Sequence, residues 1–261
     1  MSAKTHVLKV FGELACFTSP FTKVERLSQP CLTPSAARGI LDSIYLKPPE
    51  FRWQVDRIDI LAPIRYIALR RNEVKEKVSF VPGWVDGSRE IRPIFADADK
   101  AFSGSDQKGR TQRQTMALKD VEYLIYAHIV PFPGTSASLT ALDEQFVRRA
   151  KSGKCFMQPA FGNREFPAYF EYIDADEPIP KPEEINMDLG WLVYDVFDLN
   201  VSNKILCTGT IDKKSPNFKR YISKPSVSVF RGNVEHGIFT IPPYDSPLVR
   251  KATSLESEVN A

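Results

Sequence analysis

Apolar residues recur at helical spacing in one short stretch near the start of the chain, and prolines bound that stretch on both sides. Thr33 precedes it as a suitable N-cap, and Pro34 is tolerated in a first turn because its missing N–H needs no partner there. Pro48 and Pro49 prevent the helix from continuing. The pattern therefore predicts an amphipathic helix over residues 33–45. Its apolar stripe consists of Ala36, Ala37, Ile40, Leu41 and Ile44.

Alternation of apolar and polar residues predicts strands on both sides of this helix. A second helical pattern has early acids, bases in its last turn and Gly153 as a stop. The predicted strands are 6–17, 52–64, 116–132 and a pair within 154–173, with a hairpin arm over 65–80 and the second helix over 138–153. Residues 82–115 are polar and long enough to predict a functional loop. This order of elements is that of the ferredoxin-like (RRM-like) fold with insertions.

The composition changes after residue 175. Residues 176–188 are acidic and rich in proline, which is typical of a linker. Beyond them, further apolar runs are typical of strands. The sequence therefore predicts an α+β protein in which residues 1–175 form a ferredoxin-like domain and residues 189–261 form a smaller, mainly antiparallel β-sheet domain. Its polar tail, from about residue 246, is predicted to fray.

Charge is distributed unevenly, although the net charge of +3 names no partner by itself. Five basic residues and no acid lie between 145 and 164, whereas seven acids and one lysine lie between 171 and 188. A basic face beside an acidic segment is compatible with binding a polyanion, and also with a solvated surface whose charges average out. A chain of 261 residues can bury a sizeable core as one or two domains.

The cysteines and the N-terminal stretch exclude several classes of protein. Four cysteines lie far apart without a C-x-x-C pair, and none of the three histidines is near one in sequence. The sequence thus predicts no metal or other cofactor, and free thiols in a reducing cytoplasm. Lys9 and Glu13 interrupt the N-terminal apolar run, so neither a signal peptide nor a membrane span is predicted.

Three unusual strings follow one another in order: "GELACFTSPFTKVERLSQPCLTPSAARGILDSIYLKP" at 12–48, "RRNEV" at 70–74 and "FGNREFPA" at 161–168. In these strings the chain resembles the CRISPR-associated RAMP protein of type I-C systems, subtype d of the fifth Cas family. The resemblance covers residue 7 to about residue 175, and more loosely the tail.

The resemblance implies a metal-independent endoribonuclease. Such a protein cuts the hairpin repeats of precursor crRNA, then stays on the 5′ handle of the mature crRNA beside the other subunits of the type I-C Cascade. A 2′,3′-cyclic phosphate is the product expected of this chemistry. The resemblance also implies a ferredoxin-like N-terminal domain and a smaller β-sheet domain, in agreement with the order of elements above.

The resemblance places Tyr45 in the position of the family's catalytic tyrosine, with Lys47 as a nearby phosphate partner. The structural alternative for Tyr45 is a residue that caps the core with its hydroxyl in water. Members of the family carry a Lys-His pair near the start of the second helix, where this chain has Ala141 and Leu142. Acid–base work must then come from elsewhere or be absent. His128 is one alternative, and the others are lysines that could stabilise charge: Lys119, Lys151 and Lys154.

Basic residues outside this centre are candidates for RNA contact, because arginine binds phosphate bidentately and stacks on unpaired bases. The predicted RNA-binding residues are Lys23, Arg26, Lys47, Arg70, Arg71, Arg113 and Arg149. The RRNEV string could instead be structural, with Glu73 pairing an arginine. Two further hypotheses stay open, a non-catalytic RNA-binding scaffold of Cascade and a protein that binds duplex DNA through its basic loops.

Overall fold

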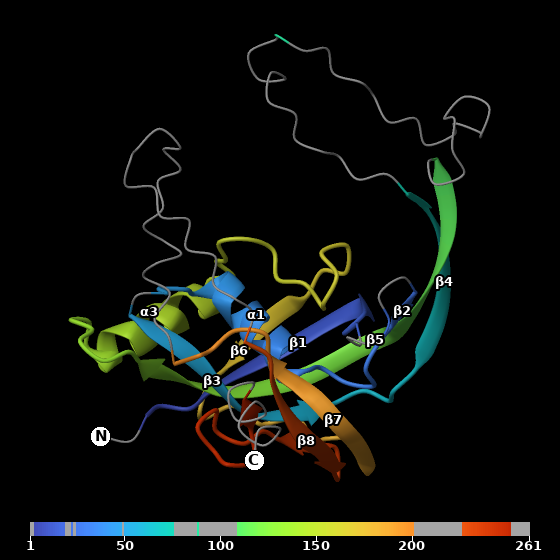
Figure 1. Cartoon of the computed structure of the whole chain (residues 1–261). Coiled ribbons are helices and arrows are strands. Elements are labelled where there is room, and N and C mark those ends of the chain that lie inside the picture. Colours follow the sequence, from blue (N-terminus) through green and yellow to red (C-terminus); the bar gives the residue numbers. More distant parts are fainter. Residues whose placement is uncertain are drawn as a thin grey trace, which may run out of the picture.

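The computed structural model of the protein describes residues 3–18, 22, 25–48, 50–75, 88, 109–200 and 226–251. The described elements, in chain order, are β1 (His6–Ala15), β2 (Arg26–Leu27), α1 (Pro34–Ile44), β3 (Phe51–Ile60), β4 (Tyr66–Val74), β5 (Arg110–Pro131), α3 (Leu139–Lys151), β6 (Tyr169–Ile173), β7 (Met187–Asp195), β8 (Ser228–Glu235), β9 (Ile238–Thr240) and β10 (Arg250–Lys251) (Figure 1). The strands join in one sheet with the order β10-β8-β9-β3-β5-β1-β6, to which β2, β4 and β7 add as side branches. The described pairs are antiparallel except that of β2 with β5.

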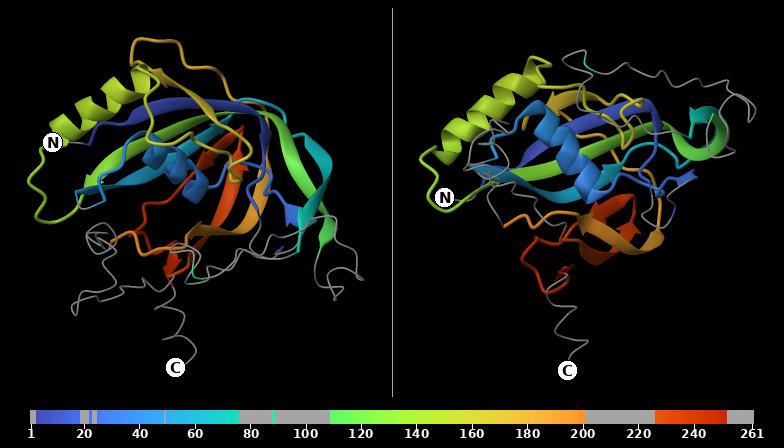
Figure 2. Two further views of the ribbon diagram at one scale, coloured as in Figure 1. Left: turned by 90° about the horizontal axis from the view of Figure 1, so that it is seen from above. Right: turned by 45° about the horizontal axis from the view of Figure 1, so that its top comes forward.

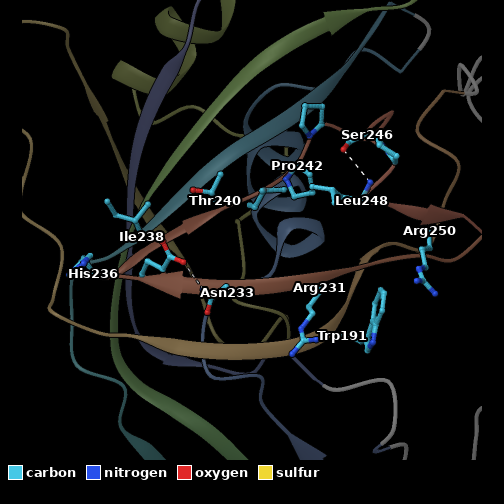
Figure 3. Close-up of a pocket in the computed structure, with 14 residues that line it drawn as sticks. Trp191, Arg231, Asn233, His236, Ile238, Thr240, Pro242, Ser246, Leu248 and Arg250 are labelled. Atoms are coloured by element: carbon cyan, nitrogen blue, oxygen red, sulfur yellow. Dashed lines mark hydrogen bonds between the residues drawn. The ribbon is translucent and has the colours of Figure 1, made fainter.

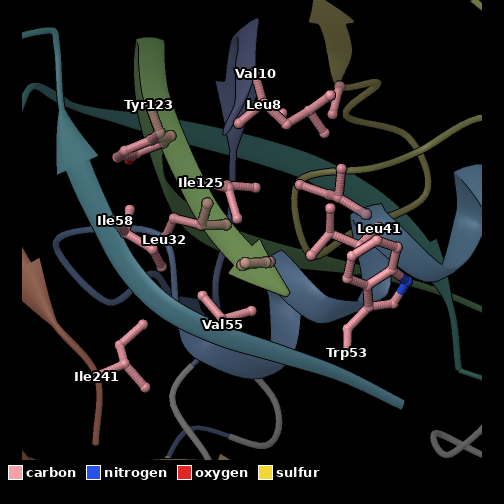
Figure 4. Packing of buried hydrophobic residues seen from close by; sticks show 14 of the residues in the cluster. Leu8, Val10, Leu32, Leu41, Trp53, Val55, Ile58, Tyr123, Ile125 and Ile241 are labelled. Atoms are coloured by element: carbon pink, nitrogen blue, oxygen red, sulfur yellow. The ribbon is translucent and has the colours of Figure 1, made fainter. Parts of the chain in front are cut away.

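The two described helices, α1 and α3, lie side by side on one face of this sheet (Figure 2). Along β1, His6, Leu8 and Val10 are buried while the residues between them are partly exposed, as a strand with one covered face requires. From α3, the ring of Phe146 lies 4.6 Å from that of Trp53 on β3. The buried side chains of these strands meet those of α1 in one core cluster (Figure 4).

The predicted first helix is confirmed as α1. Thr33 caps it by accepting a hydrogen bond from the amide of Ala36 (3.4 Å), and Pro34 occupies the first turn. The helix ends at Tyr45, which has extended backbone angles and donates its N–H to the carbonyl of Leu41 (2.9 Å). Its buried face consists of Pro34, Ala37, Ile40, Leu41 and Ile44, close to the predicted stripe.

β4 and β5 form an arm that extends beyond the rest of the sheet (Figure 1). The predicted hairpin arm is confirmed where β4 runs. The loop predicted over 82–115 is wrong at its end, because β5 already begins at Arg110 and pairs there with Val74. Thr111 and Thr115 are β-branched and suit a strand, and the pairing satisfies backbone groups that the sequence alone leaves without partners. Of the remaining loop, all but Ser88 and Gly109 lies outside the described residues.

The segment before β6 differs from the strand pair predicted within 154–173. In this fully described segment β6 is a strand, and a single bridge joins Ala160 to Pro167. Gly162 has φ +81°, a left-handed conformation that ends the extended run. A Cβ at Gly162 would lie 2.0 Å from the carbonyl oxygen of Cys16, so the segment turns tightly against the end of β1.

The strands after residue 186 continue the same sheet. β9 pairs with β3, and the amide of Ile60 donates to the carbonyl of Gly237 (2.8 Å). The rings of Phe230 and Phe239 stack 5.9 Å apart inside the core cluster. β7 begins at Met187, so the end of the predicted linker is already a strand. The mainly antiparallel arrangement is thus confirmed, while the division into two domains stays a prediction.

The predicted fraying from residue 246 is wrong for the described residues up to Lys251. The amide of Val249 donates to the carbonyl of Ser246 (3.0 Å) in a turn, and β10 then pairs with β8. A two-residue strand has no sequence period, so it was not predictable from alternation. One of the apolar runs predicted as strands after the linker, residues 203–211, lies outside the described residues, as do residues 252–261. No helix in the described ranges is long and apolar enough to cross a membrane.

Candidate functional site

Tyr45 is fixed at the exit of α1 by contacts with β3. Its carbonyl accepts a hydrogen bond from the indole N–H of Trp53 (3.0 Å), and its ring packs on that of Phe51 at 5.3 Å between centroids. Trp53 is itself held edge-on against Phe146 of α3. The backbone and ring of Tyr45 are therefore held by two residues of β3, one of which packs on α3, and have little freedom to move.

The phenol of Tyr45 faces a pocket of about 410 Å³. The pocket is lined by Tyr45, Lys47, Ala137, Ala141, Leu142, Gln145, Arg149 and Phe156. Only 3% of Tyr45 is exposed, yet its hydroxyl has no hydrogen-bond partner among the described residues. Burial raises the pKa of Tyr45, and the charges of Lys47 and Arg149 oppose that shift. The hydroxyl is therefore protonated at neutral pH and can donate a hydrogen bond to a ligand.

Arg149 supplies a fixed cation to this pocket. Its Nε donates to the carbonyl of Ile44 at the end of α1 (2.6 Å), and its guanidinium lies 4.1 Å from the centre of the Phe156 ring. Within the described ranges it forms no ion pair, so its charge is available to an anion. Three bases occupy the last turn of α3, where cations suit the helix dipole: Arg148, Arg149 and Lys151.

Lys47 is the second cation of the pocket and is held loosely. Its ammonium lies 3.3 Å from a carboxylate oxygen of Glu50, and 46% of the side chain is exposed. Exposed ion pairs of this kind contribute little stability, so an incoming phosphate can compete for the ammonium. Together, Tyr45, Lys47 and Arg149 present one hydroxyl donor and two cations, which is the equipment for binding a phosphate group.

Three predicted RNA-binding residues gather elsewhere, in the outer half of the described β4–β5 arm. Arg113 and Arg26 both approach Glu73, at 2.9 and 3.4 Å. Arg71 pairs with Glu165 and donates to the hydroxyl of Thr115 (3.2 Å). Glu73 therefore pairs with arginine, as the structural alternative for the RRNEV string proposed.

The other predicted RNA-binding residues on or near the arm differ in accessibility. Arg70 is exposed on the opposite side of β4 from Arg71, and it has no ion pair in the part of the chain that the structure describes. Lys23 lies outside the described residues.

His128 and Lys154, the other predicted catalytic residues, lie in different places. His128 is on β5, where its Nδ1 lies 2.7 Å from Asp56. Its neighbours Ala127 and Ile129 are buried in the core, so alternation places His128 on the opposite face of the sheet from Tyr45. Lys154 is exposed in the loop after α3, where its amide donates to the carbonyl of Arg149 (2.9 Å).

The alternative lysines are engaged with acids, since Lys151 lies 2.7 Å from Asp174 and Lys119 lies 3.9 Å from Asp120. Among the described residues, no group of three or more His, Cys, Asp or Glu side chains is placed to hold a metal ion.

Sequence reasoning missed Phe156 and His6. Phe156 interrupts the basic stretch between 145 and 164 with an apolar side chain in a polar loop, which was the available signal. His6 is buried, with Nε2 2.8 Å from Asp143 and Nδ1 3.2 Å from the hydroxyl of Tyr172. Burial lowers the pKa of His6, and Asp143 opposes that shift. His6 thus ties β1 to α3, the helix that carries Arg149.

A larger cavity of about 740 Å³ lies at the C-terminal strands (Figure 3). The ring of Trp191 on β7 stands beside Arg231 of β8, its partner across the strands, and the guanidinium of Arg250 lies 4.8 Å from its centre. Arg231 is paired with Asp188 at 2.7 Å. None of the predicted site residues described here lines this cavity.

The fold and the first pocket define an α+β protein with a cationic site suited to a phosphate group. Residues 5–239 match the CRISPR-associated Cas5 family in its Cas5d form, and the chain belongs to this family. This confirms the resemblance to subtype d of the fifth Cas family.

The relatives agree with this assignment. The chain is 37% identical over 250 residues to the CRISPR pre-crRNA endoribonuclease Cas5d of Mannheimia succiniciproducens, covering 94% of this chain and 97% of the relative. It is 40% identical over 189 residues to the protein of the same name from Thermus thermophilus, covering 72% of each chain. The crystal structure of a CRISPR-associated protein is similar with a TM-score of 0.58 at 17% identity, covering 95% of this chain and 97% of that chain. A functionally uncharacterised protein of Streptococcus mutans gives a TM-score of 0.57 at 17% identity, with the same coverage.

Proposed function

We propose that this chain is a CRISPR pre-crRNA endoribonuclease and that the pocket at the exit of α1 is its cleavage centre. The observation that carries the proposal is the phenol of Tyr45, which has no hydrogen-bond partner among the described residues and lies near the cations of Lys47 and Arg149. The relatives that bear this activity in their names are 37–40% identical to the chain, which supports the same chemistry here.

RNA cleavage without a metal has three requirements: the 2′-hydroxyl must lose a proton, the 5′-oxygen must gain one, and the charge on the phosphorane must be stabilised. The 2′-hydroxyl passes its proton to a water molecule as its oxygen attacks phosphorus, the bond from phosphorus to the 5′-oxygen breaks, and that oxygen takes up a proton. The protonated phenol of Tyr45 is suited to donate to the 5′-oxygen or to a phosphate oxygen. Lys47 and Arg149 stabilise the charge that develops on the phosphorane. The product is then a 2′,3′-cyclic phosphate and a 5′-hydroxyl.

Lys154 adds a further cation to this proposal, from the loop between Arg149 and Phe156. His128 stands apart from the centre on the other face, with its ring held by Asp56. Any part that His128 plays therefore requires RNA to reach both faces of the sheet.

RNA contact beyond the scissile phosphate is proposed along the β4–β5 arm. Arg70 is exposed there, and Arg26, Arg71 and Arg113 form a cluster in which three guanidiniums share two carboxylates. An excess of positive charge remains for phosphates of the repeat. Lys23 belongs to the same proposal by its sequence position. After cleavage the same surface would keep the 5′ handle of the mature crRNA beside the other subunits of Cascade.

We also propose a cytoplasmic location for the protein and the ferredoxin-like arrangement for the first part of the chain. The order β1-α1-β3-β5-α3-β6 in sequence and β3-β5-β1-β6 in the sheet supports it. The division into residues 1–175, the linker 176–188 and residues 189–261 belongs to the same proposal.

A second candidate function is a non-catalytic RNA-binding scaffold of Cascade. Ala141 and Leu142 favour it, because both line the pocket where the family's Lys-His pair would stand, and neither can transfer a proton. A duplex-DNA-binding role is a third candidate, supported by the basic arm alone.

Purified protein incubated with repeat RNA in excess EDTA separates the three. An endoribonuclease cuts the RNA, and a single 2′-deoxy substitution at the cut nucleotide abolishes cutting because it removes the attacking oxygen. Cleavage that persists on the 2′-deoxy RNA would refute the mechanism. A scaffold shifts the RNA on a gel without cutting it, and a DNA binder retains duplexes of any sequence in a strongly salt-dependent manner.

A further inference from the structure

The wall of the Tyr45 pocket carries a large apolar side chain that the fold leaves in water. Phe156 is 62% exposed, although most other aromatic rings near it are buried in the core. Its neighbour Met157 is 60% exposed but does not line the pocket. Exposure of the Phe156 ring leaves unburied an apolar surface whose burial would be stabilising, and its place in the wall of a cationic pocket allows a ligand to cover it.

The exposed ring is nevertheless rigidly placed. The amide of Phe156 donates to the carbonyl of Ser43 in α1 (2.7 Å), and the amide of Lys154 donates to the carbonyl of Arg149 in α3 (2.9 Å). Gly153, with φ +64°, makes the turn that leads from the helix into this loop. The loop is therefore attached to both helices, and the ring loses little conformational freedom when a ligand contacts it.

Arg149 completes the arrangement. Its guanidinium lies 4.1 Å from the centre of the Phe156 ring while Nε is bound to Ile44, so both planes are fixed relative to the end of α1. The terminal nitrogens have no hydrogen-bond partner among the described residues. An aromatic ring with an adjoining arginine is how proteins hold an unpaired nucleotide, with the base stacked and the phosphate bound by the cation.

We propose that Phe156 forms a nucleobase subsite, on which the unpaired base adjoining the scissile phosphate stacks while Arg149 binds that phosphate. This inference rests on the proposed function, since it places the RNA strand so that its phosphate meets the hydroxyl of Tyr45. Phe156 is in this view a positioning residue for the substrate. The stacked base need not be of one kind, because every base has a π face.

The test compares Phe156→Ala, Phe156→Trp and Met157→Ala as matched variants. Affinity is measured with repeat RNA that carries a 2′-deoxy nucleotide at the cut site and cannot be cleaved. Phe156→Ala should weaken binding about tenfold or more, as expected for one lost stacking contact. Phe156→Trp keeps a stacking surface and should stay within about threefold of wild type, as should Met157→Ala. Circular dichroism of each variant checks that the fold is kept.

An abasic substitution at each nucleotide flanking the cut locates the stacked base. At that nucleotide the abasic RNA should bind wild type weakly, and Phe156→Ala should cause no further loss, because both changes remove the same contact. Losses that simply add at every position, or wild-type affinity in Phe156→Ala, would overturn the subsite. These readouts depend on binding alone, so a wild-type protein that never cuts RNA refutes the proposed function and leaves the subsite to be decided separately.

Discussion

Two pairs of an exposed aromatic ring and an arginine stand on different parts of this molecule. Phe156 and Arg149 meet at 4.1 Å in the pocket at the exit of α1, and Trp191 and Arg250 meet at 4.8 Å at the C-terminal strands. The two rings are 62% and 51% exposed. As pairs, they are nearly equivalent platforms for a base or another planar group.

What differs is the set of neighbours. Beside Phe156 stand the ammonium of Lys47 and the hydroxyl of Tyr45, which the described part of the chain leaves without a partner, and Arg149 is anchored to a helix end. Beside Trp191 stands Arg231, whose charge is already taken by Asp188 at 2.7 Å. A stacking pair alone offers binding. A hydroxyl donor beside Arg149, which has no ion pair among the described residues, and beside the loosely paired Lys47 adds the means to stabilise a reacting phosphate. We therefore expect chemistry at the first region only.

Tyr45→Phe should have the largest effect. The ring can keep its packing on Phe51, so affinity for repeat RNA should stay within a few-fold, while the single-turnover cleavage rate should fall by about 10²-fold or more with the loss of the donor. The control in the other region is Tyr244→Phe, which removes a hydroxyl bound to Asp198 and should cleave normally. Wild-type cleavage by Tyr45→Phe would mean that Tyr45 is structural.

Arg149→Ala and Arg250→Ala compare the two arginines directly. Removing Arg149 withdraws a cation from the phosphate, and cleavage should slow by about ten- to a hundredfold. Arg149→Lys should recover only part of this, because lysine cannot bind the carbonyl of Ile44 and a phosphate with one rigid group. Arg250→Ala should leave the cleavage rate unchanged. Equal losses of cleavage rate in Arg149→Ala and Arg250→Ala would contradict the assignment of the chemistry to the first region alone.

Lys47→Ala tests the loosely held cation. Its removal should weaken RNA affinity a few-fold and reduce the slope of log affinity against log salt by about one phosphate contact. Lys251→Ala, at the C-terminal strands, is the matched control and should leave the slope unaltered. A slope identical to wild type in Lys47→Ala would show that Lys47 does not meet a phosphate.

The smallest effect is expected on the pH dependence of stability, through His6. This residue contacts Asp143 of α3, the helix that carries Arg149. Burial lowers its pKa in the folded protein, so as pH falls below the ordinary histidine range the unfolded chain takes up a proton that folded His6 resists. Stability should therefore decrease with this acidification. His6→Gln can still donate to Asp143 without titrating, and its melting temperature should vary less between pH 7 and 5, by a few degrees.

The control for this measurement is His236→Gln. His236 belongs to an exposed pair with Glu184 in the C-terminal region, with 73% and 67% of the side chains exposed. Exposed pairs contribute little to stability, so this variant should follow wild type at every pH. Identical pH profiles for wild type and His6→Gln would show that His6 does not couple folding to protonation.

The parts that sequence could predict are those set by local chemistry. The first helix follows from Thr33, Pro34 and an apolar stripe, and its exit carries Tyr45 and Lys47 whatever lies around it. The resemblance to the family supplied the catalytic role expected for Tyr45 and the phosphate contact expected for Lys47. Together they were enough to select two of the residues that line the pocket, and Arg149 was selected for its charge.

The parts that sequence could not predict depend on contacts between distant segments. Phe156 matters because its loop binds Ser43 of α1, and His6 because it meets Asp143, a residue 137 positions away. The periodicity of apolar residues along the sequence does not indicate such long-range contacts. The same limit explains the start of β5, since the strand character of residues 110–115 depends on β4.

The pairing of β9 with β3 has a consequence for shortening the chain. Ile60 receives a partner for its amide from Gly237 and for its carbonyl from Glu183, and Ile241 donates to Asp56 (2.9 Å). A chain that stopped at residue 175 would lose all three and leave one long side of β3 with bare hydrogen-bonding groups. Bare edges of this kind recruit strands from other copies. The C-terminal strands thus cover this edge of β3. The first 175 residues alone should self-associate more than the whole chain at equal concentration, as measured by size-exclusion chromatography.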